Sequence, residues 1–187
     1  MDGVANPNSR IGMASFTPIT NDSNHKYIAI VEDSVNLNAT NPRALCIQYF
    51  YCDNLANGTL NATTPITILL PKVNNRRGAP YVTSLPDGRI AIVFMSSQEY
   101  YGYDRGATST YTRVIDMYIS KIPITYGMEL TDNLFAKCDF FDFGENQWGR
   151  WPAIECIDDK LYRTFTFGVN TSASAATRYG NVIISTM

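Results

Sequence analysis

The residues suited to chemistry are one carboxylate and a set of arginine, tryptophan and tyrosine side chains. Glu32 directly follows the apolar run Tyr27–Val31. A carboxyl group at the end of a strand can act as a nucleophile or as a general acid and base. Arginine forks bind planar anions at two points, and aromatic faces stack on sugar rings. The candidate ligand-binding residues are Arg10, Arg77, Glu99, Tyr101, Trp148, Arg150 and Trp151.

Each candidate also has a structural interpretation that the sequence leaves open. Glu32 can be a solvated strand end that pairs with Arg10, and the arginines can be ordinary surface charges. The tryptophans can pack in the core or at its rim, and Glu99 can belong to a solvated loop with its tyrosine neighbours. Four other polar residues are interpreted as turn or surface residues: Asp87, Asp158, Asp159 and His25.

The chain lacks the motifs of several other chemistries. It holds a single histidine and no HExxH, P-loop or GxGxxG pattern, so we expect neither histidine-based catalysis nor a cofactor. No CxxC spacing occurs, and we expect no metal site. Cys46 and Cys52 share one expected strand and lie about 20 Å apart at about 3.3 Å per residue, so they cannot pair. All four cysteines, which include Cys138 and Cys156, are expected to be buried free thiols.

Three hairpin-like repeats organise the chain. Ala14, Pro80 and Pro152 mark equivalent points, which are 66 residues (14 to 80) and 72 residues (80 to 152) apart. After each marker come an apolar alternation, a polar turn and a second strand, and the middle copy turns at Pro86-Asp87-Gly88. Sheet units repeated at a roughly constant period indicate a propeller or a similar array.

The sequence therefore predicts an all-β fold, a single partial β-propeller domain over residues 1–187 with about three four-stranded antiparallel blades. The blade repeats cover about 10–71, 76–139 and 148–187. The expected strands are 12–20, 26–32, 44–51, 66–70, 79–85, 90–96, 112–121, 134–139, 151–157, 161–167 and 181–186. The third repeat lacks a fourth strand, which residues 1–9 can supply. Propellers close with four to eight blades, so the chain is either part of a six-bladed ring or half of a ring made by two copies.

Antiparallel order places the candidate residues at one end of the blades. The start of each inner strand and the end of the next strand lie at the same end, and the polar turn between them lies at the other. The residues and loops expected at the candidate end are Arg10, Glu32, 33–43, Arg76, Arg77, 97–111, Trp148, Arg150, Trp151 and 168–179.

Composition excludes two partner classes and leaves the compartment open. The net charge is −2 with no basic run, so nucleic acid is not an expected partner. No apolar stretch reaches the roughly 18 residues of a membrane span, and the opening Met1-Asp2-Gly3 has no signal-peptide pattern. Five glycosylation sequons favour a secreted eukaryotic protein, while a bacterial protein with unused sequons fits equally well. They begin at Asn21, Asn38, Asn57, Asn61 and Asn170.

At its repeats the sequence resembles the sialidase-like β-propeller superfamily of BNR-repeat glycosidases, and within it the exo-α-1,5-L-arabinanase family. The matching stretches are SRIGMASFTPIT, KYIAIVE, RGAPYVTSLPDGRIAIVFMS and WPAIECIDDKLYRTF. They are similar to successive blades in the C-terminal half of a six-bladed ring. Gly12 stands where the sialidase Arg-Ile-Pro pattern has proline, and no clear Asp-box is present.

The resemblance implies an extracellular exo-acting glycoside hydrolase with Glu32 as one catalytic carboxylate. Retaining glycosidases use two carboxyl groups about 5 Å apart. The equivalent strand ends of the other repeats carry Met95 and Thr166, so the second carboxylate is expected from a preceding blade, with Glu99 as a weaker candidate. The carbohydrate would contact the seven ligand-binding candidates. A non-catalytic carbohydrate-binding propeller and a structural propeller are the alternatives.

Overall fold

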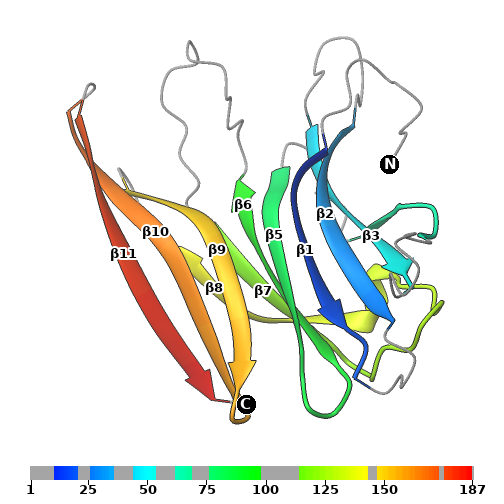
Figure 1. Cartoon of the computed structure of the whole chain (residues 1–187). Coiled ribbons are helices and arrows are strands. Elements are labelled where there is room, and N and C mark those ends of the chain that lie inside the picture. Colours follow the sequence, from blue (N-terminus) through cyan, green and yellow to red (C-terminus); the bar gives the residue numbers. More distant parts are fainter. Residues whose placement is uncertain are drawn as a thin grey trace.

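Three antiparallel sheets stand side by side in the computed structural model, which describes residues 11–20, 26–35, 44–53, 62–68, 76–97, 114–142, 147–172 and 175–186 (Figure 1). The first sheet contains β1 (Ile11–Pro18), β2 (Tyr27–Val35), β3 (Ala44–Cys52) and β4 (Ile66–Ile68) in that order. The second contains β5 (Arg76–Ser84), β6 (Ile90–Ser97), β7 (Val114–Ser120) and β8 (Phe135–Asp142). The third contains β9 (Gln147–Ile157), β10 (Lys160–Ser172) and β11 (Ala175–Thr186).

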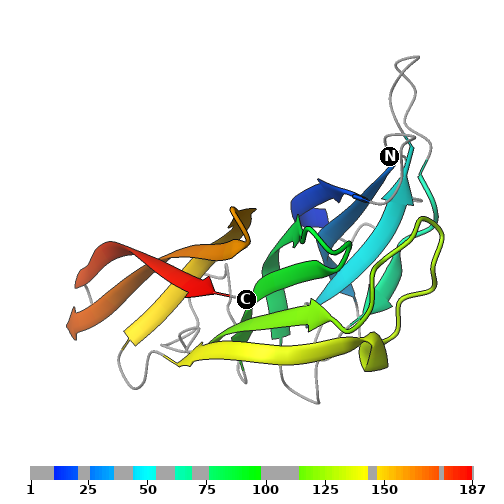
Figure 2. The ribbon, with the colours of Figure 1, turned by 90° about the horizontal axis from the view of Figure 1, so that it is seen from below.

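The sheets are arranged as blades. β1 lies beside β5 and β5 beside β9, while the later strands of each sheet fan away from them (Figure 2). The described residues contain no α-helix, only a 3-10 turn at Asp132–Leu134. The predicted all-β, partial propeller-like fold is therefore confirmed.

Burial of the middle sheet on both faces explains its continuous apolar run. Ile90, Ile92 and Phe94 point toward the first sheet and pack with its Ile28 and Ile30. The alternate residues Ala91 and Val93 pack with Ile154 and Leu161 of the third sheet. A strand with one wet face would alternate apolar and polar residues instead. The two apolar layers of β6 therefore connect all three sheets.

Hydroxyl groups join the first two inner strands, which share no ladder. Ser15 Oγ accepts the Val82 N–H at 3.1 Å, and Thr17 Oγ1 accepts the Ser84 N–H at 3.0 Å. The Ser84 hydroxyl donates to the carbonyl oxygen of Pro18. Buried backbone N–H groups require partners, so these side chains satisfy the edge of β5 that faces β1.

The connection between β7 and β8 also crosses a seam between sheets. Ile124 and Leu130 lie in the core between the first two sheets. Tyr51 Oη donates to the carbonyl oxygen of Met128 at 2.8 Å, and Tyr49 Oη accepts the Leu130 N–H at 2.9 Å. No sequence pattern indicated that this connection reaches back onto β3.

Several predicted strand limits are too short. β2 continues three residues past Glu32, and β9 begins at Gln147 instead of 151. The expected loop 168–179 is wrong, because β10 runs to Ser172 and β11 starts at Ala175. Small and polar residues dominate this stretch, but cross-strand pairing satisfies its backbone. The outer strand expected from residues 1–9 lies outside the described residues.

The turn and thiol interpretations have mixed outcomes. Asp158 and Asp159 form the two-residue link between β9 and β10 with φ values of 49° and 61°, as in a type I′ turn. Cys52 is a buried free thiol as expected, whereas Cys156 is only half-buried and Cys138 is exposed, and the side chain of Cys46 lies outside the described residues. Within the described ranges, no helix could span a bilayer, and no three His, Cys, Asp or Glu side chains gather as metal ligands.

Candidate functional site

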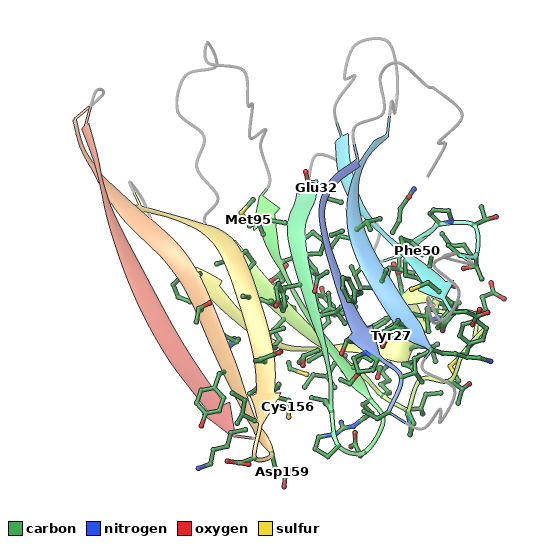
Figure 3. All side chains as sticks on the ribbon, viewed as in Figure 1. Tyr27, Glu32, Phe50, Met95, Cys156 and Asp159 are labelled. Atoms are coloured by element: carbon green, nitrogen blue, oxygen red, sulfur yellow. The ribbon has the colours of Figure 1, made fainter. Side chains whose placement is uncertain are left out.

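Glu32 projects from β2 toward the second sheet. Ile28 and Ile30, on the same face of β2, are fully buried there, and Glu32 continues their row toward the end where β5 begins (Figure 3). Its side chain is 8% exposed. A carboxyl group thus occupies a position where the strand period places core residues. Met95 lies at the same end of β6, one sheet further along (Figure 3).

A bulge in β5 supplies the hydrogen-bond partner of Glu32. The pairing of β5 with β6 shifts by one residue between Gly78 and Tyr81. Ala79, inside this bulge, has a φ of 47° and is 1% exposed. Its N–H donates to Glu32 Oε2 at 2.5 Å. The bulge therefore turns a backbone donor away from β6 and toward the carboxyl group of the neighbouring sheet.

Burial sets the protonation behaviour of this carboxyl group. Desolvation raises the pKa of Glu32 above its ordinary value, and the Ala79 N–H opposes the rise by favouring the charged form. Among the side chains that the structure describes, no lysine or arginine forms an ion pair with Glu32. A buried carboxyl group with a raised pKa can hold a proton nearer to neutral pH and release it again, as a general acid requires.

Ala79 adopts a conformation that alanine rarely takes. The left-handed region costs an L-residue about 1–2 kcal/mol, and such outliers gather at functional sites. The sequence signal was Pro80, whose missing N–H is tolerated within sheets at bulges and edges. The sequence identifies Pro80 only as a repeat marker, and no sequence feature indicates the backbone donor that precedes it.

Substitutions at Ala79 are expected to separate backbone strain from side-chain packing. Ala79→Gly should change the free energy of unfolding by less than about 1 kcal/mol, because relief of strain is offset by a lost methyl group and a more flexible unfolded chain. Ala79→Val should cost at least about 2 kcal/mol, since a branched side chain fits this φ poorly. Urea unfolding measures both. Equal stability of the two variants would contradict the left-handed conformation.

The backbone of the four other candidates that the structure describes lies at the same end of the sheets as Glu32. Arg77 is in β5, two residues before Ala79, and pairs with Ser96. Trp148 and Arg150 pair with Gly168 and Thr166, at the start of β9. These pairings place strand residues of all three sheets together at this end. Trp151 follows in β9, within a register shift like that of β5. Three further candidates lie outside the described residues: Arg10, Glu99 and Tyr101.

Comparisons with known proteins identify the fold. No protein-family model and no curated protein sequence matches the chain. A solved structure of Zg3597, a family 117 glycoside hydrolase from the marine bacterium Zobellia galactanivorans, aligns with a TM-score of 0.59 at 12% identity over 95% of this chain and 53% of its own. A solved structure of BT0996, described as an RGII complex, aligns with the same TM-score and identity over 95% of this chain and 54% of its own. The chain shares their fold and spans about half their length.

Proposed function

We propose that this chain forms part of a β-propeller glycoside hydrolase that acts on terminal sugars of a glycan or polysaccharide, with Glu32 as one of two catalytic carboxyl groups. The observation that carries the proposal is the Glu32 carboxyl group, buried and held by the Ala79 N–H at the end of the blades. The fold shared with a family 117 glycoside hydrolase supports the reaction class. The sialidase-like or exo-arabinanase-like substrate preference rests on the sequence resemblance.

Glu32 suits the acid and base role in this scheme. In a retaining enzyme, protonated Glu32 would donate to the glycosidic oxygen while the second carboxylate attacks the anomeric carbon, and the Glu32 carboxylate would then remove a proton from the water that releases the sugar. In an inverting enzyme, Glu32 would act as the acid only and the second carboxylate would activate the water. The Ala79 N–H binds one carboxyl oxygen and so fixes the orientation of the other. A second carboxyl group about 5 Å away would give retention, and one about 6.5–9.5 Å away would give inversion.

None of the side chains that the structure describes is a clear second carboxylate. Asp116 is buried in β7, but its Oδ1 lies 2.5 Å from Lys137 Nζ, so it serves a structural ion pair. The second group is therefore proposed to come from outside these residues. The arginine and aromatic residues at the same end, Arg10, Arg77, Tyr101, Trp148, Arg150 and Trp151, together with Glu99, are proposed to line the sugar site.

Glu32→Gln tests the proposal because the amide keeps the size of the side chain and an acceptor for Ala79. With a panel of oligosaccharides, whose sugar leaving groups need protonation, we expect turnover to fall about 10²–10⁴-fold, which is the usual contribution of a general acid or base. Sugar binding measured by calorimetry should persist. Glu129→Gln, at an exposed carboxylate in the β7–β8 connection, is the matched control and should keep full turnover.

Two results would count against hydrolysis. Turnover that survives in Glu32→Gln would remove Glu32 from the chemistry. Sugar binding by the wild type without turnover on any glycoside, while Glu32→Gln binds equally well, would favour the alternative of a carbohydrate-binding propeller.

A further inference from the structure

Two large apolar side chains are exposed at opposite ends of the three-sheet array. Phe16 of β1 is 70% exposed, and Ile157 of β9 is 51% exposed. Phe16 points away from the second sheet, because its neighbours Ser15 and Thr17 bond to β5. Ile157 points away from the second sheet as well, because Ile154 and Cys156 pack toward it. Each residue therefore lies on a sheet face with no neighbouring blade among the described residues.

The internal repeat shows which blade covers the residues that correspond to Phe16 in the second and third sheets. Its counterparts at spacings of 66 and 72 residues are Val82 in β5 and Ile154 in β9. Val82 is 2% exposed, in the core shared with the first sheet. Ile154 is 1% exposed, in the core shared with the second sheet. At this position, the inner strand of a blade is thus buried against the preceding blade.

The same comparison for Ile157 indicates a following blade instead of a preceding one. Its counterparts at the same spacings are Ile19 and Leu85. Ile19 is 4% exposed in the core between the first and second sheets, and Leu85 is fully buried in the core between the second and third. At this position, the inner strand is buried against the following blade. Ile157 lacks that cover.

The exposed parts of the two faces therefore call for opposite neighbouring blades. On the first sheet the exposure is confined to β1, because Ala29, Val31, Phe50 and Cys52 on the same face are buried. One face needs a preceding blade and the other a following blade, and this chain carries one face of each kind. Two copies related by a two-fold axis would satisfy both faces twice and supply six sheets, within the range in which propellers close. The aligned solved structures, of which this chain spans 53% and 54%, have about the length of two such copies.

We propose that two copies of this chain close one ring, with the third sheet of each copy seated on the first sheet of the other. Phe16 of one copy and Ile157 of the other are then buried in the same interface. The interface forms twice in the dimer. This inference does not depend on hydrolytic activity, because it rests on blade packing alone.

Light scattering on the purified chain at several concentrations tests the proposal. The expected mass is twice the 20.9 kDa of one copy. Phe16→Glu and Ile157→Glu should each raise the dissociation constant at least about 100-fold, because each places a charge in both interfaces. Ile122→Glu, at a residue 43% exposed in the β7–β8 connection, is the matched control and should remain dimeric. Phe16→Ala should weaken the dimer in the same direction, and circular dichroism checks that every variant is folded.

Mixing the two charged variants identifies which faces meet. In a heterodimer of Phe16→Glu and Ile157→Glu, one interface carries both substitutions and the other carries neither. The mixture should therefore associate more tightly than either variant alone. A monomeric wild type, as expected if further blades of a longer polypeptide cover these faces, would overturn the proposal. So would a dimer that Ile157→Glu leaves intact, because the first sheets would then pair with each other.

Discussion

Glu32→Gln is expected to make the protein more stable at neutral pH while it removes turnover. Burial raises the pKa of the Glu32 carboxyl group in the folded state. The folded chain then holds this proton more tightly than the unfolded chain, so the stability that Glu32 contributes is fully present below its unfolded pKa. It is lost as the pH rises through the folded pKa. Each pKa unit of difference is worth about 1.4 kcal/mol.

The amide has no such penalty, because it stays neutral at every pH and its oxygen still accepts the Ala79 N–H. The free energy of unfolding of Glu32→Gln should therefore exceed that of the wild type at pH 8. The two should converge as the pH falls toward the ordinary glutamic acid pKa of about 4.3. Urea unfolding at a series of pH values measures the difference. The exposed control Glu129→Gln should follow the wild type throughout, and a Glu32→Gln variant that is less stable than the wild type at pH 8 would contradict the burial of an ionised carboxylate.

The sequence was sufficient to predict the order of the blades and to assign Glu32 to the second strand of the first blade. The 66- and 72-residue spacings hold where the inner strands end, because the Ile19 N–H donates to the Lys26 carbonyl oxygen, the Leu85 N–H donates to the Arg89 carbonyl oxygen, and Ile157 pairs with Lys160. In the structure, Ile28, Ile30 and Glu32 share one face of β2, as the two-residue period of a strand requires. Local periodicity carries this information because each blade repeats the same local structure.

Other features of the site depend on contacts that no local pattern encodes. The partner of Glu32 is a backbone N–H of another sheet, and it became available through a bulge at Ala79. Every residue except proline carries a backbone N–H, so no pattern of charged and aromatic residues could indicate which one binds Glu32. The sequence predicts a strand that ends at Glu32, yet β2 continues to Val35, because its pairing with β3 extends to Ala44.

The β7–β8 connection is the largest element of the described core that sequence reasoning missed. Exposed and buried residues in this connection follow neither a strand period nor a helix period. Ile122, for example, is exposed, whereas Ile124, two residues later, is buried. Whether such a residue is buried depends on which surface the connection meets. Here that surface is β3, which lies more than 70 residues earlier in the chain and holds the connection through Tyr49 and Tyr51.

Ile124→Ala is expected to lower the free energy of unfolding by about 2–5 kcal/mol, the range for a fully buried isoleucine. The side chain is 1% exposed in the core between the first two sheets, and its N–H donates to the Gly88 carbonyl oxygen at 2.9 Å. Alanine keeps that hydrogen bond, so the loss reports the side chain alone. Ile122→Ala, two residues earlier and 43% exposed, should cost less than about 1 kcal/mol. Equal losses at the two positions would show that the connection is not buried between the sheets.

The same pair of variants can show whether packing between the first and second sheets stabilises all three sheets. Both tryptophans lie in β9, so their fluorescence reports on the third sheet, whereas circular dichroism reports on all strands. Ile124 is buried at the other seam, between the first and second sheets. Because β6 packs on both of its neighbours, loss of packing at one seam should destabilise all three sheets together. The two probes should therefore give the same urea midpoint in Ile124→Ala. A fluorescence midpoint that stays at the wild-type value while the dichroism midpoint falls would mean that the third sheet unfolds independently.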